Sequence, residues 1–417
     1  MNQAITNTLP DFASMPLEQF DLSDPTMFEQ DFWQPVFKRL RDDSPIHYQE
    51  DSYAGPFWSV TRYEDIVAVE MDTETFSSDP SIAILDPEPD MVLRMFIAMD
   101  PPEHDDQRRA VQGVVAPRNL KEFEGLIRER TIEVLDSLPE NETFNWVETV
   151  SRDLTTKMLA TLFDFPYEER QRLTEWSDAF TSDERITGGE GLTLQERREI
   201  VLECLQYFTE LWHQKKDDGK EAFDLIRMLQ NDPKTANMVD DPLTYMGNIM
   251  LLIVGGNDTT RNSMSGGLWF LNQNPDEFTK LRENPDLIPN MVSEMIRYQT
   301  PLPHMRRTVT KDVEFRGQQM KKGDKVILWY ISANRDDTAL DNPDQFVIDR
   351  KDARKHLSFG CGIHRCMGNR LGEMQLRILW EELLKRFKSI EVVGEPVRTK
   401  NLFVRGYVDL PVRVQRY

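Results

Sequence analysis

The stretch "HLSFGCGIHRCMGNR" at residues 356–370 places two cysteines among three glycines. A thiolate is a ligand for soft metal ions, and glycines let a backbone turn tightly and approach a flat ligand. Cys366 directly precedes the helical apolar pattern of residues 371–387, so backbone N–H groups at the helix start are expected to lower its thiol pKa. Cys361 lacks that placement, and both Cys361 and Cys204 are interpreted as small buried apolar residues. The pattern therefore indicates a metal ligand at Cys366.

A second unusual group lies in the apolar stretch 240–273, which is predicted to form one buried helix of roughly 50 Å. Its centre contains Gly255 and Gly256, followed by Asp258 and Thr259. An interior glycine costs about 1 kcal/mol relative to alanine, and a buried carboxylate needs a partner or a raised pKa. These residues favour a functional explanation. The alternative is structural: the glycines allow close helix packing, and threonine hydroxyls bond to carbonyls one turn earlier.

The elements that must position these residues are mostly helices. Residues 103–230 show charged helical patterns separated by Pro and Gly, whereas short alternating strands occur in 312–336 and 401–415. The sequence predicts a mainly α fold with a small β region. Because no linker or repeat is visible, residues 1–417 are expected to form a single domain whose first 40 or so residues are extended.

Composition limits the function classes. The formal net charge of -22 argues against nucleic-acid binding, which rewards clustered Lys and Arg. Three cysteines cannot form a disulfide framework, and the start of the chain lacks the pattern of a signal peptide. The strongest apolar run, residues 249–254, is far shorter than the ~20 residues of a membrane helix. The chain is expected to be cytoplasmic, without a transmembrane segment.

The motifs together resemble those of the cytochrome P450 monooxygenases. The haem-binding signature F-x-x-G-x-H-x-C-x-G is matched by Phe359, Gly362, His364, Cys366 and Gly368. "GGNDTT" at 255–260 is similar to the oxygen-activating helix motif of the family, and Glu294 with Arg297 matches its E-x-x-R pair. The resemblance is closer to a bacterial soluble subgroup, the alkane and fatty-acid terminal (omega) hydroxylases. It implies the cytochrome P450 fold, with haem between a long central helix and the cysteine loop.

The resemblance also implies roles for individual residues. Cys366 would be the axial thiolate of haem b, and Asp258 and Thr259 would relay protons and hydrogen bonds to oxygen. The propionates would be held by His104, Arg108, Arg307 and His364. The substrate would contact an apolar set consisting of Ile82, Leu85, Leu251, Val254, Gly255, Leu302, Phe403 and Val404.

Two features concern the surroundings of the haem. Gln345 stands where the family usually has Arg or His, so the Glu294 network is expected to use a neutral hydrogen bond or another residue. Residues 350–377 form a basic island in an acidic chain: Arg350, Lys351, Arg354, Lys355, Arg365, Arg370 and Arg377. By resemblance an acidic ferredoxin, reduced by a ferredoxin reductase with a nicotinamide cofactor, would dock there. The alternative is a solvated face with balancing charges elsewhere.

The predicted activity is insertion of one oxygen atom of O2 into an unactivated C–H bond of an apolar substrate. Terminal hydroxylation of medium-chain alkanes is expected, and a less regioselective fatty-acid or terpenoid hydroxylase is the alternative. A haem-thiolate sensor or carrier would need Cys366 but not Asp258 and Thr259. A peroxide-driven peroxygenase would typically have a different pair at those two positions.

Overall fold

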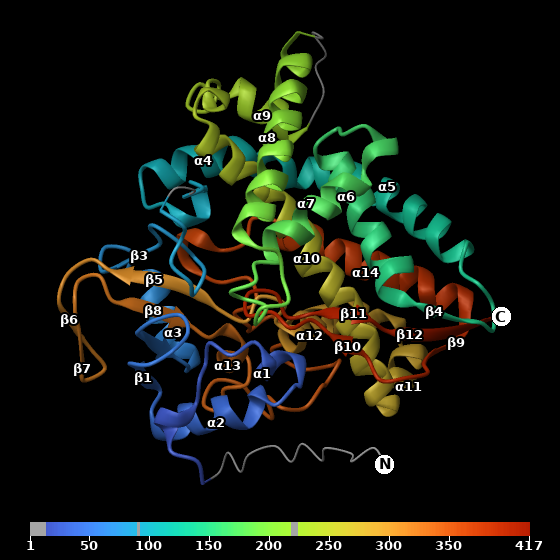
Figure 1. Cartoon of the computed structure of the whole chain (residues 1–417). Helices are drawn as coiled ribbons and strands as arrows, with labels where there is room; N and C mark the ends of the chain where they lie inside the picture. Colours follow the sequence, from blue (N-terminus) through green and yellow to red (C-terminus); the bar gives the residue numbers. More distant parts are fainter. Residues whose placement is uncertain (1–13, 90–91, 218–223) are drawn as a thin grey trace, which may run out of the picture.

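A computed structural model describes residues 14–89, 92–217 and 224–417. Helices make up most of the described chain and surround one long central helix, as Figure 1 shows. The helices are α1 (Thr26–Glu29), α2 (Trp33–Asp43), α3 (Tyr63–Met71), α4 (Glu103–Gln112), α5 (Pro117–Asp136), α6 (Asp153–Leu162), α7 (Gln171–Thr181), α8 (Leu194–Asp217), α9 (Leu225–Asn231), α10 (Pro242–Gln273), α11 (Pro275–Glu283), α12 (Ile288–Gln299), α13 (Tyr330–Ala333) and α14 (Asn369–Arg386).

The strands form small sheets at two sides of the helical body (Figure 1). The largest has the order β1-β2-β8-β5-β3, in which only the β2–β8 pair is parallel. A second sheet has the order β4-β12-β9, and the pairs β10-β11 and β6-β7 stand alone. The strands are β1 (Ile46–Gln49), β2 (Phe57–Val60), β3 (Phe76–Ser77), β4 (Thr143–Asn145), β5 (Met305–Val309), β6 (Val313–Phe315), β7 (Gln318–Met320), β8 (Lys325–Leu328), β9 (Phe387–Val392), β10 (Val397–Arg398), β11 (Tyr407–Asp409) and β12 (Pro411–Arg416). The mainly α prediction with a small β region is confirmed.

Helix α10 is the long helix predicted from the apolar stretch. Its start is set by Asp241, whose side chain accepts a hydrogen bond from the backbone N–H of Thr244, and by Pro242 in the first turn. Most of its residues are buried because it packs against α6, α7, α12 and α14. It therefore crosses the middle of the molecule and can present its central residues to an interior site.

The beginning of the chain differs from the expected extended segment. Helix α2 starts at Trp33, and the side chains of Trp33, Phe37 and Leu40 lie completely buried in a core cluster that also includes Phe28 of α1. These residues recur at the i, i+4, i+7 spacing of an amphipathic helix. The helical period was therefore present in the sequence and should have predicted α2.

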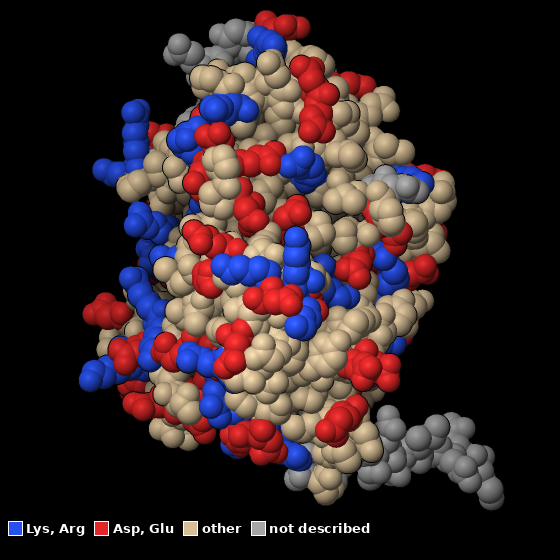
Figure 2. Space-filling view, turned by 90° about the vertical axis from the view of Figure 1, so that its left-hand side faces the viewer, with Lys and Arg blue, Asp and Glu red and all other residues tan. Residues whose placement is uncertain are grey.

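The surface carries the charge of this acidic chain in mixed form. On the face drawn in Figure 2, Lys and Arg side chains lie interspersed with Asp and Glu. Many exposed pairs are ion pairs one helical turn apart, such as Lys38 with Asp42. Over the described ranges, no helix is long and apolar enough to span a membrane.

Candidate active site

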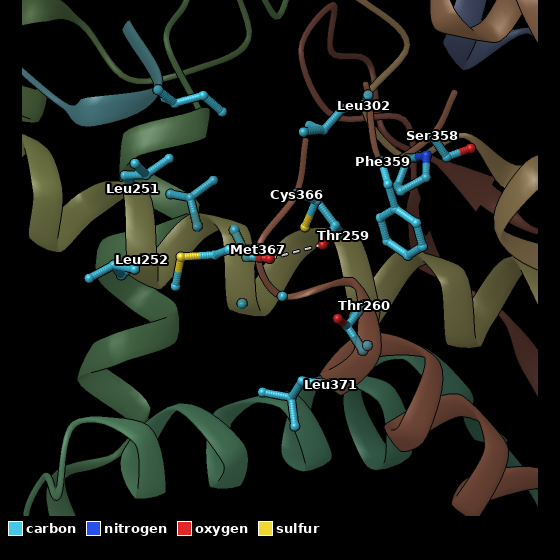
Figure 3. Close-up of a pocket in the computed structure, with 18 of the residues that line it drawn as sticks. Leu251, Leu252, Thr259, Thr260, Leu302, Ser358, Phe359, Cys366, Met367 and Leu371 are labelled. Atoms are coloured by element: carbon cyan, nitrogen blue, oxygen red, sulfur yellow. Dashed lines mark hydrogen bonds between the residues drawn. The ribbon is translucent and has the colours of Figure 1, made fainter. Parts of the chain in front are cut away.

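One cavity lies between α10 and the loop that contains Cys366. Its lining comes from segments far apart in the sequence: the loop before α4, helices α6, α7, α10 and α14, strand β5, and the cysteine loop. Figure 3 shows the Cys366 sulfur pointing into this space toward the segment of α10 that contains Thr259. The two groups that the sequence singled out as chemically unusual therefore face one space.

The cysteine loop is held in shape by its backbone. The N–H of Cys366 donates to the carbonyl of Phe359 at 2.8 Å, which closes the loop just before α14 begins at Asn369. Gly360 and Gly362 both have φ near +63°, a conformation that favours glycine. A Cβ on Gly362 would also lie 2.8 Å from the carbonyl oxygen of Glu70. The glycines are thus required by the turn and by its close approach to α3.

The expected lowering of the Cys366 thiol pKa is not observed. Burial raises this pKa above 9.0, and it outweighs the lowering effects of the backbone N–H groups of Gly368 and Asn369 and of Arg108. The exposed surface of Cys366 faces the cavity that it lines. Burial likewise raises the pKa of Cys361 to about 12, and Cys204 is fully buried in the apolar core.

On the opposite side of the cavity, the two central glycines of α10 have different surroundings. A Cβ on Gly255 would meet nothing within 4 Å, so this position opens onto the cavity. A Cβ on Gly256 would lie 2.9 Å from a methyl group of Leu159, so this position allows α6 to approach. The Thr259 hydroxyl donates to the Gly255 carbonyl at 3.0 Å (dashed line in Figure 3) while it lines the cavity. Gly256 and the Thr259 hydroxyl therefore show the packing and the carbonyl bond of the structural interpretation, whereas Gly255 leaves space open on the cavity side.

Asp258 points away from the cavity, toward α7. Its carboxylate accepts hydrogen bonds from Ser177 at 3.0 Å and from Arg261 at 2.5 Å, and it is completely buried. Arg261 also bonds Asp178 at 2.9 Å, and Asp178 pairs with Arg152, which lies near the surface. Burial raises the pKa of Asp258 above 3.8 despite the nearby Arg261. A row of charged groups thus links the surface to the side of α10 that faces away from the cavity.

One edge of the cavity collects polar groups that lack partners. The Nε2 atom of His104 and the Nδ1 atom of His364 are buried and have no hydrogen-bond partner in the described part of the chain. Their rings lie 4.5 Å apart, and the Nε2 atom of His364 contacts the Ser78 hydroxyl at 2.9 Å. Burial lowers the pKa of His364 to about 2, helped by the charge of Arg307, so this imidazole is neutral. Arg108 and Arg307 also line the cavity, and they lie at the same edge, because the charges of both lower the pKa of His364.

Arg307 has a partner that the sequence did not predict. Its guanidinium donates to the Glu70 carboxylate at 2.8 Å and to the Arg306 carbonyl at 2.8 Å. The Tyr330 hydroxyl donates to the other oxygen of Glu70. All three side chains are buried. Glu70 stands one helical turn after Ile66, on the buried side of α3, and an acidic residue on an apolar helix face was the signal that could have revealed it.

The predicted substrate residues divide into two groups. Ile82, Leu251, Val254, Gly255, Leu302 and Phe403 line the cavity. Leu85 instead packs against the core cluster around α1 and α2, and Val404 is buried outside the cavity lining. The backbone bends after Asn401, whose Oδ1 atom accepts from the N–H groups of both Phe403 and Val404, and only Phe403 enters the cavity lining. The sequence missed further apolar lining residues, among them Phe180 of α7 and Met95.

The E-x-x-R pair belongs to a closed network behind the cysteine loop. Arg297 bonds both carboxylate oxygens of Glu294, at 2.7 and 2.8 Å, and donates to the carbonyls of Asn334, Pro343 and Gln345. Arg350 adds a bond to Glu294 at 2.9 Å. Gln345 contributes only its backbone oxygen, so Arg350 is the other residue that completes the network.

The comparisons with known proteins agree with this geometry. The cytochrome P450 family profile matches residues 191–406. Linalool 8-monooxygenase from Pseudomonas putida is 31% identical over 408 residues, which is 95% of this chain and 99% of that protein. The solved structure of CYP153D17 from Sphingomonas sp. PAMC 26605 is 46% identical with a TM-score of 0.89, covering 96% of this chain and 100% of that chain. The solved structure of cytochrome P450-153 from Novosphingobium aromaticivorans is 44% identical with a TM-score of 0.87, covering 95% of this chain and 99% of that chain.

The chain belongs to the cytochrome P450 family and is a haem-thiolate monooxygenase. The cavity fits such a cofactor: a sulfur lies on one side, the open face at Gly255 on the other, and cationic and unpartnered imidazole groups at one edge. As a P450 of a bacterial class, the enzyme obtains its electrons from redox partner proteins.

Proposed function

We propose that this P450 hydroxylates the terminal methyl group of medium-length linear hydrocarbons. The observation that supports this most is the lining of the cavity beside Gly255, where Leu251, Val254, Leu302 and Phe403 present only hydrocarbon surface. Such a lining holds an apolar chain by burial, at about 0.8 kcal/mol per methylene group, and offers no polar group to orient a functional group. The sequence resemblance to the alkane and fatty-acid terminal hydroxylases points to the same substrate class.

The charges of the cavity favour an uncharged substrate over a fatty acid. Among the described lining residues, only Arg108 and Arg307 carry a charge, and both lie at the edge with His364. If both hold cofactor propionates, a carboxylate in the remaining space would be buried without a cation, which is strongly unfavourable. We therefore expect octane to bind more tightly than octanoate, measured by the substrate-induced change in the haem spectrum.

In this proposal the residues divide the work between holding the cofactor and moving protons. Cys366 would hold the haem iron through its thiolate, and His104, Arg108, Arg307 and His364 would contact the propionates. When bound through a thiolate, haem iron activates dioxygen for insertion into a C–H bond. Thr259 offers its hydroxyl at the cavity surface, where it can exchange its bond to the Gly255 carbonyl for one to oxygen. Asp258 receives protons from the surface through the groups around Arg261 and Asp178.

The position of hydroxylation tests the substrate assignment. A terminal C–H bond is stronger than its methylene neighbours, so terminal attack requires the chain to be held end-on. Octane should give mainly 1-octanol, and Phe403→Ala or Leu302→Ala should shift product toward 2- and 3-octanol. Val404→Ala is the matched control, because Val404 neighbours Phe403 but lies outside the cavity lining. Mainly subterminal alcohols from the unaltered enzyme would disprove the terminal assignment.

The ligand assignment has its own test. The reduced carbon monoxide complex should show the long-wavelength Soret band of a thiolate-ligated haem. Cys366→Ser should abolish that band, whereas Cys361→Ser should retain it because Cys361 stands in the same loop without lining the cavity. The reverse result would place the ligand at Cys361.

An acidic ferredoxin, reduced by a ferredoxin reductase with a nicotinamide cofactor, is the redox partner that the surface favours. The basic island is smaller than expected, because Arg350 is buried against Glu294 and Arg377 pairs with Glu124 and Glu381. Its remaining members are all exposed, namely Lys351, Arg354, Lys355, Arg365 and Arg370. Met71, with 64% of its surface exposed, lies beside Gly362 and adds an apolar contact at this place.

Salt and charge reversal test this docking surface. The rate of electron transfer from a reduced ferredoxin should fall steeply with ionic strength, as for other electrostatically steered encounters. Reversing Arg365 and Arg370 to Glu should lower the rate and flatten its salt dependence. Reversing Lys388 and Arg413, two exposed residues on the β4-β12-β9 sheet, is the control. An equal effect of both double variants would exclude a specific docking role for the island.

A terpenoid hydroxylase is the second candidate. It is favoured by the 31% identity to linalool 8-monooxygenase, which extends over nearly the whole chain. A competition experiment with equal concentrations of octane and linalool separates the two candidates by the ratio of kcat/KM. A ratio in favour of linalool would replace the alkane proposal with this one.

A further inference from the structure

Glu70 forms a buried cluster that the P450 motifs do not include. It lies on α3, accepts from Arg307 of β5 at 2.8 Å, and accepts from the hydroxyl of Tyr330 on α13. Arg307 and Tyr330 line the cavity, whereas Glu70 lies behind them. The Glu70 side chain is 1% exposed, so almost none of its charge is screened by water.

The cluster changes the charge balance at the edge of the cavity. Two guanidinium groups, those of Arg108 and Arg307, face this edge, and two propionates would require both. Glu70 already offsets the charge of Arg307, which is held by its ion pair and by its bond to the Arg306 carbonyl. Because Glu70 pairs with Arg307, this edge carries a smaller net positive charge than its two arginines suggest.

We infer that Glu70 is a positioning residue that fixes Arg307 and lowers the reduction potential of the haem. A buried negative charge near a redox centre disfavours the addition of an electron, and the effect is large where the dielectric constant is low. Tyr330 moderates it, because its O–H dipole points at the carboxylate. The inference rests on the proposed role of Arg307 at a haem propionate.

The test is the reduction potential of the substrate-free, haem-loaded enzyme, followed by the Soret band in a mediated titration. Glu70→Gln removes the charge while keeping a side chain of the same size, and it should shift the potential to more positive values. Tyr330→Phe removes the moderating dipole and should produce a smaller shift in the opposite direction. A purely structural role would lower the melting temperature or the haem content without this pair of opposite shifts.

A control variant exists on the same helix. Asp65 of α3 is also buried and pairs with an arginine, Arg316, at 2.7 Å, but it does not line or border the cavity groups. Asp65→Asn should therefore leave the potential at the wild-type value. An unaltered potential in Glu70→Gln overturns the inference. If that variant does not load haem, an unaltered potential in Tyr330→Phe overturns it instead.

Arg307→Gln separates this inference from the proposed function. It should release haem faster than wild type when apomyoglobin is added as an acceptor. Haem release at the wild-type rate would overturn the assignment of Arg307 to a propionate. Faster release combined with an unaltered potential in Glu70→Gln would overturn only the inference about Glu70.

Discussion

Two of the buried acid–arginine pairs with i, i+3 spacing, Glu294–Arg297 and Asp258–Arg261, differ in where their hydrogen bonds lead. The Glu294–Arg297 pair of α12 is closed: both side chains are completely buried, and their other partners are Arg350, Val347 and backbone carbonyls. The Asp258–Arg261 pair of α10 is open, because Arg261 continues to Asp178, whose side chain is 35% exposed. Spacing alone therefore does not distinguish a structural pair from one that connects with solvent.

The pKa values of the two acids follow from this difference. Burial acts to raise both, but Arg297, the Val347 N–H and Arg350 hold the pKa of Glu294 below 4.5. Asp258 has fewer compensating donors and a second carboxylate nearby, Asp178, so its pKa rises above 3.8. A fully compensated carboxylate stabilises the fold, whereas a weakly compensated one gains and loses its proton more readily.

Removing the closed acid should have the largest effect. Glu294→Gln leaves Arg297 and Arg350 buried without a counter-charge, and breaking such a pair costs about 3–5 kcal/mol. The yield of haem-loaded protein and the urea midpoint should both fall sharply. Asp42→Asn, which breaks an exposed pair with Lys38, should change both little. A small effect of Glu294→Gln would mean that backbone carbonyls alone compensate the two arginines.

Removing the open acid should slow turnover more than it destabilises the fold, since Arg261 keeps Asp178 as a partner. Asp258→Asn should lower kcat about 100-fold, a typical contribution of acid–base catalysis, and raise the solvent deuterium isotope effect. Asp178→Asn removes the same charge one step closer to the surface and should slow turnover less. Wild-type turnover and isotope effect in Asp258→Asn would contradict the proton path.

Thr259 tests the end of that path at the cavity. Thr259→Ala should retain haem and octane binding but divert reducing equivalents to hydrogen peroxide, lowering the product formed per nicotinamide oxidised several-fold. Thr260→Ala, at the adjacent lining residue, should keep the coupling near the wild-type value. Unchanged coupling in Thr259→Ala would assign its hydroxyl only to the Gly255 carbonyl.

The comparison also shows which parts of the site a sequence can predict. The cysteine loop and the centre of α10 are local patterns, in which neighbouring residues and helix geometry decide the arrangement. The partner of Glu294 could not be predicted, because Arg350 lies 56 positions away and was interpreted as a surface residue. Phe403 and Val404 are adjacent and similarly apolar, so only the packing of their loop decides which of them lines the cavity.

The smallest expected effect is a difference in the pH dependence of stability. If the pKa of a group differs by one between the folded and unfolded states, its ionisation changes the free energy of unfolding by about 1.4 kcal/mol. Glu294 has a folded pKa below 4.5, so its ionisation stabilises the fold above 4.5, and this contribution is lost as the pH falls through the folded pKa. Asp258 has a folded pKa above 3.8, so its ionisation destabilises the fold progressively as the pH rises from 3.8 through the folded pKa.

Urea unfolding of the haem-loaded proteins over this pH window gives the free energy of unfolding of each variant minus that of wild type. Plotted against pH, this difference should have slopes of opposite sign for Glu294→Gln and Asp258→Asn. Glu294→Gln should be less stable than wild type, and this loss of unfolding free energy should shrink as the pH falls below 4.5. Wild type then loses the stabilisation that the variant lacks. The asparagine of Asp258→Asn stays neutral, so the free energy of unfolding of this variant should increase relative to that of wild type as the pH rises above 3.8. Slopes of the same sign would show that the two acids are equally compensated, and that the open pair does not hold its proton more tightly than the closed one.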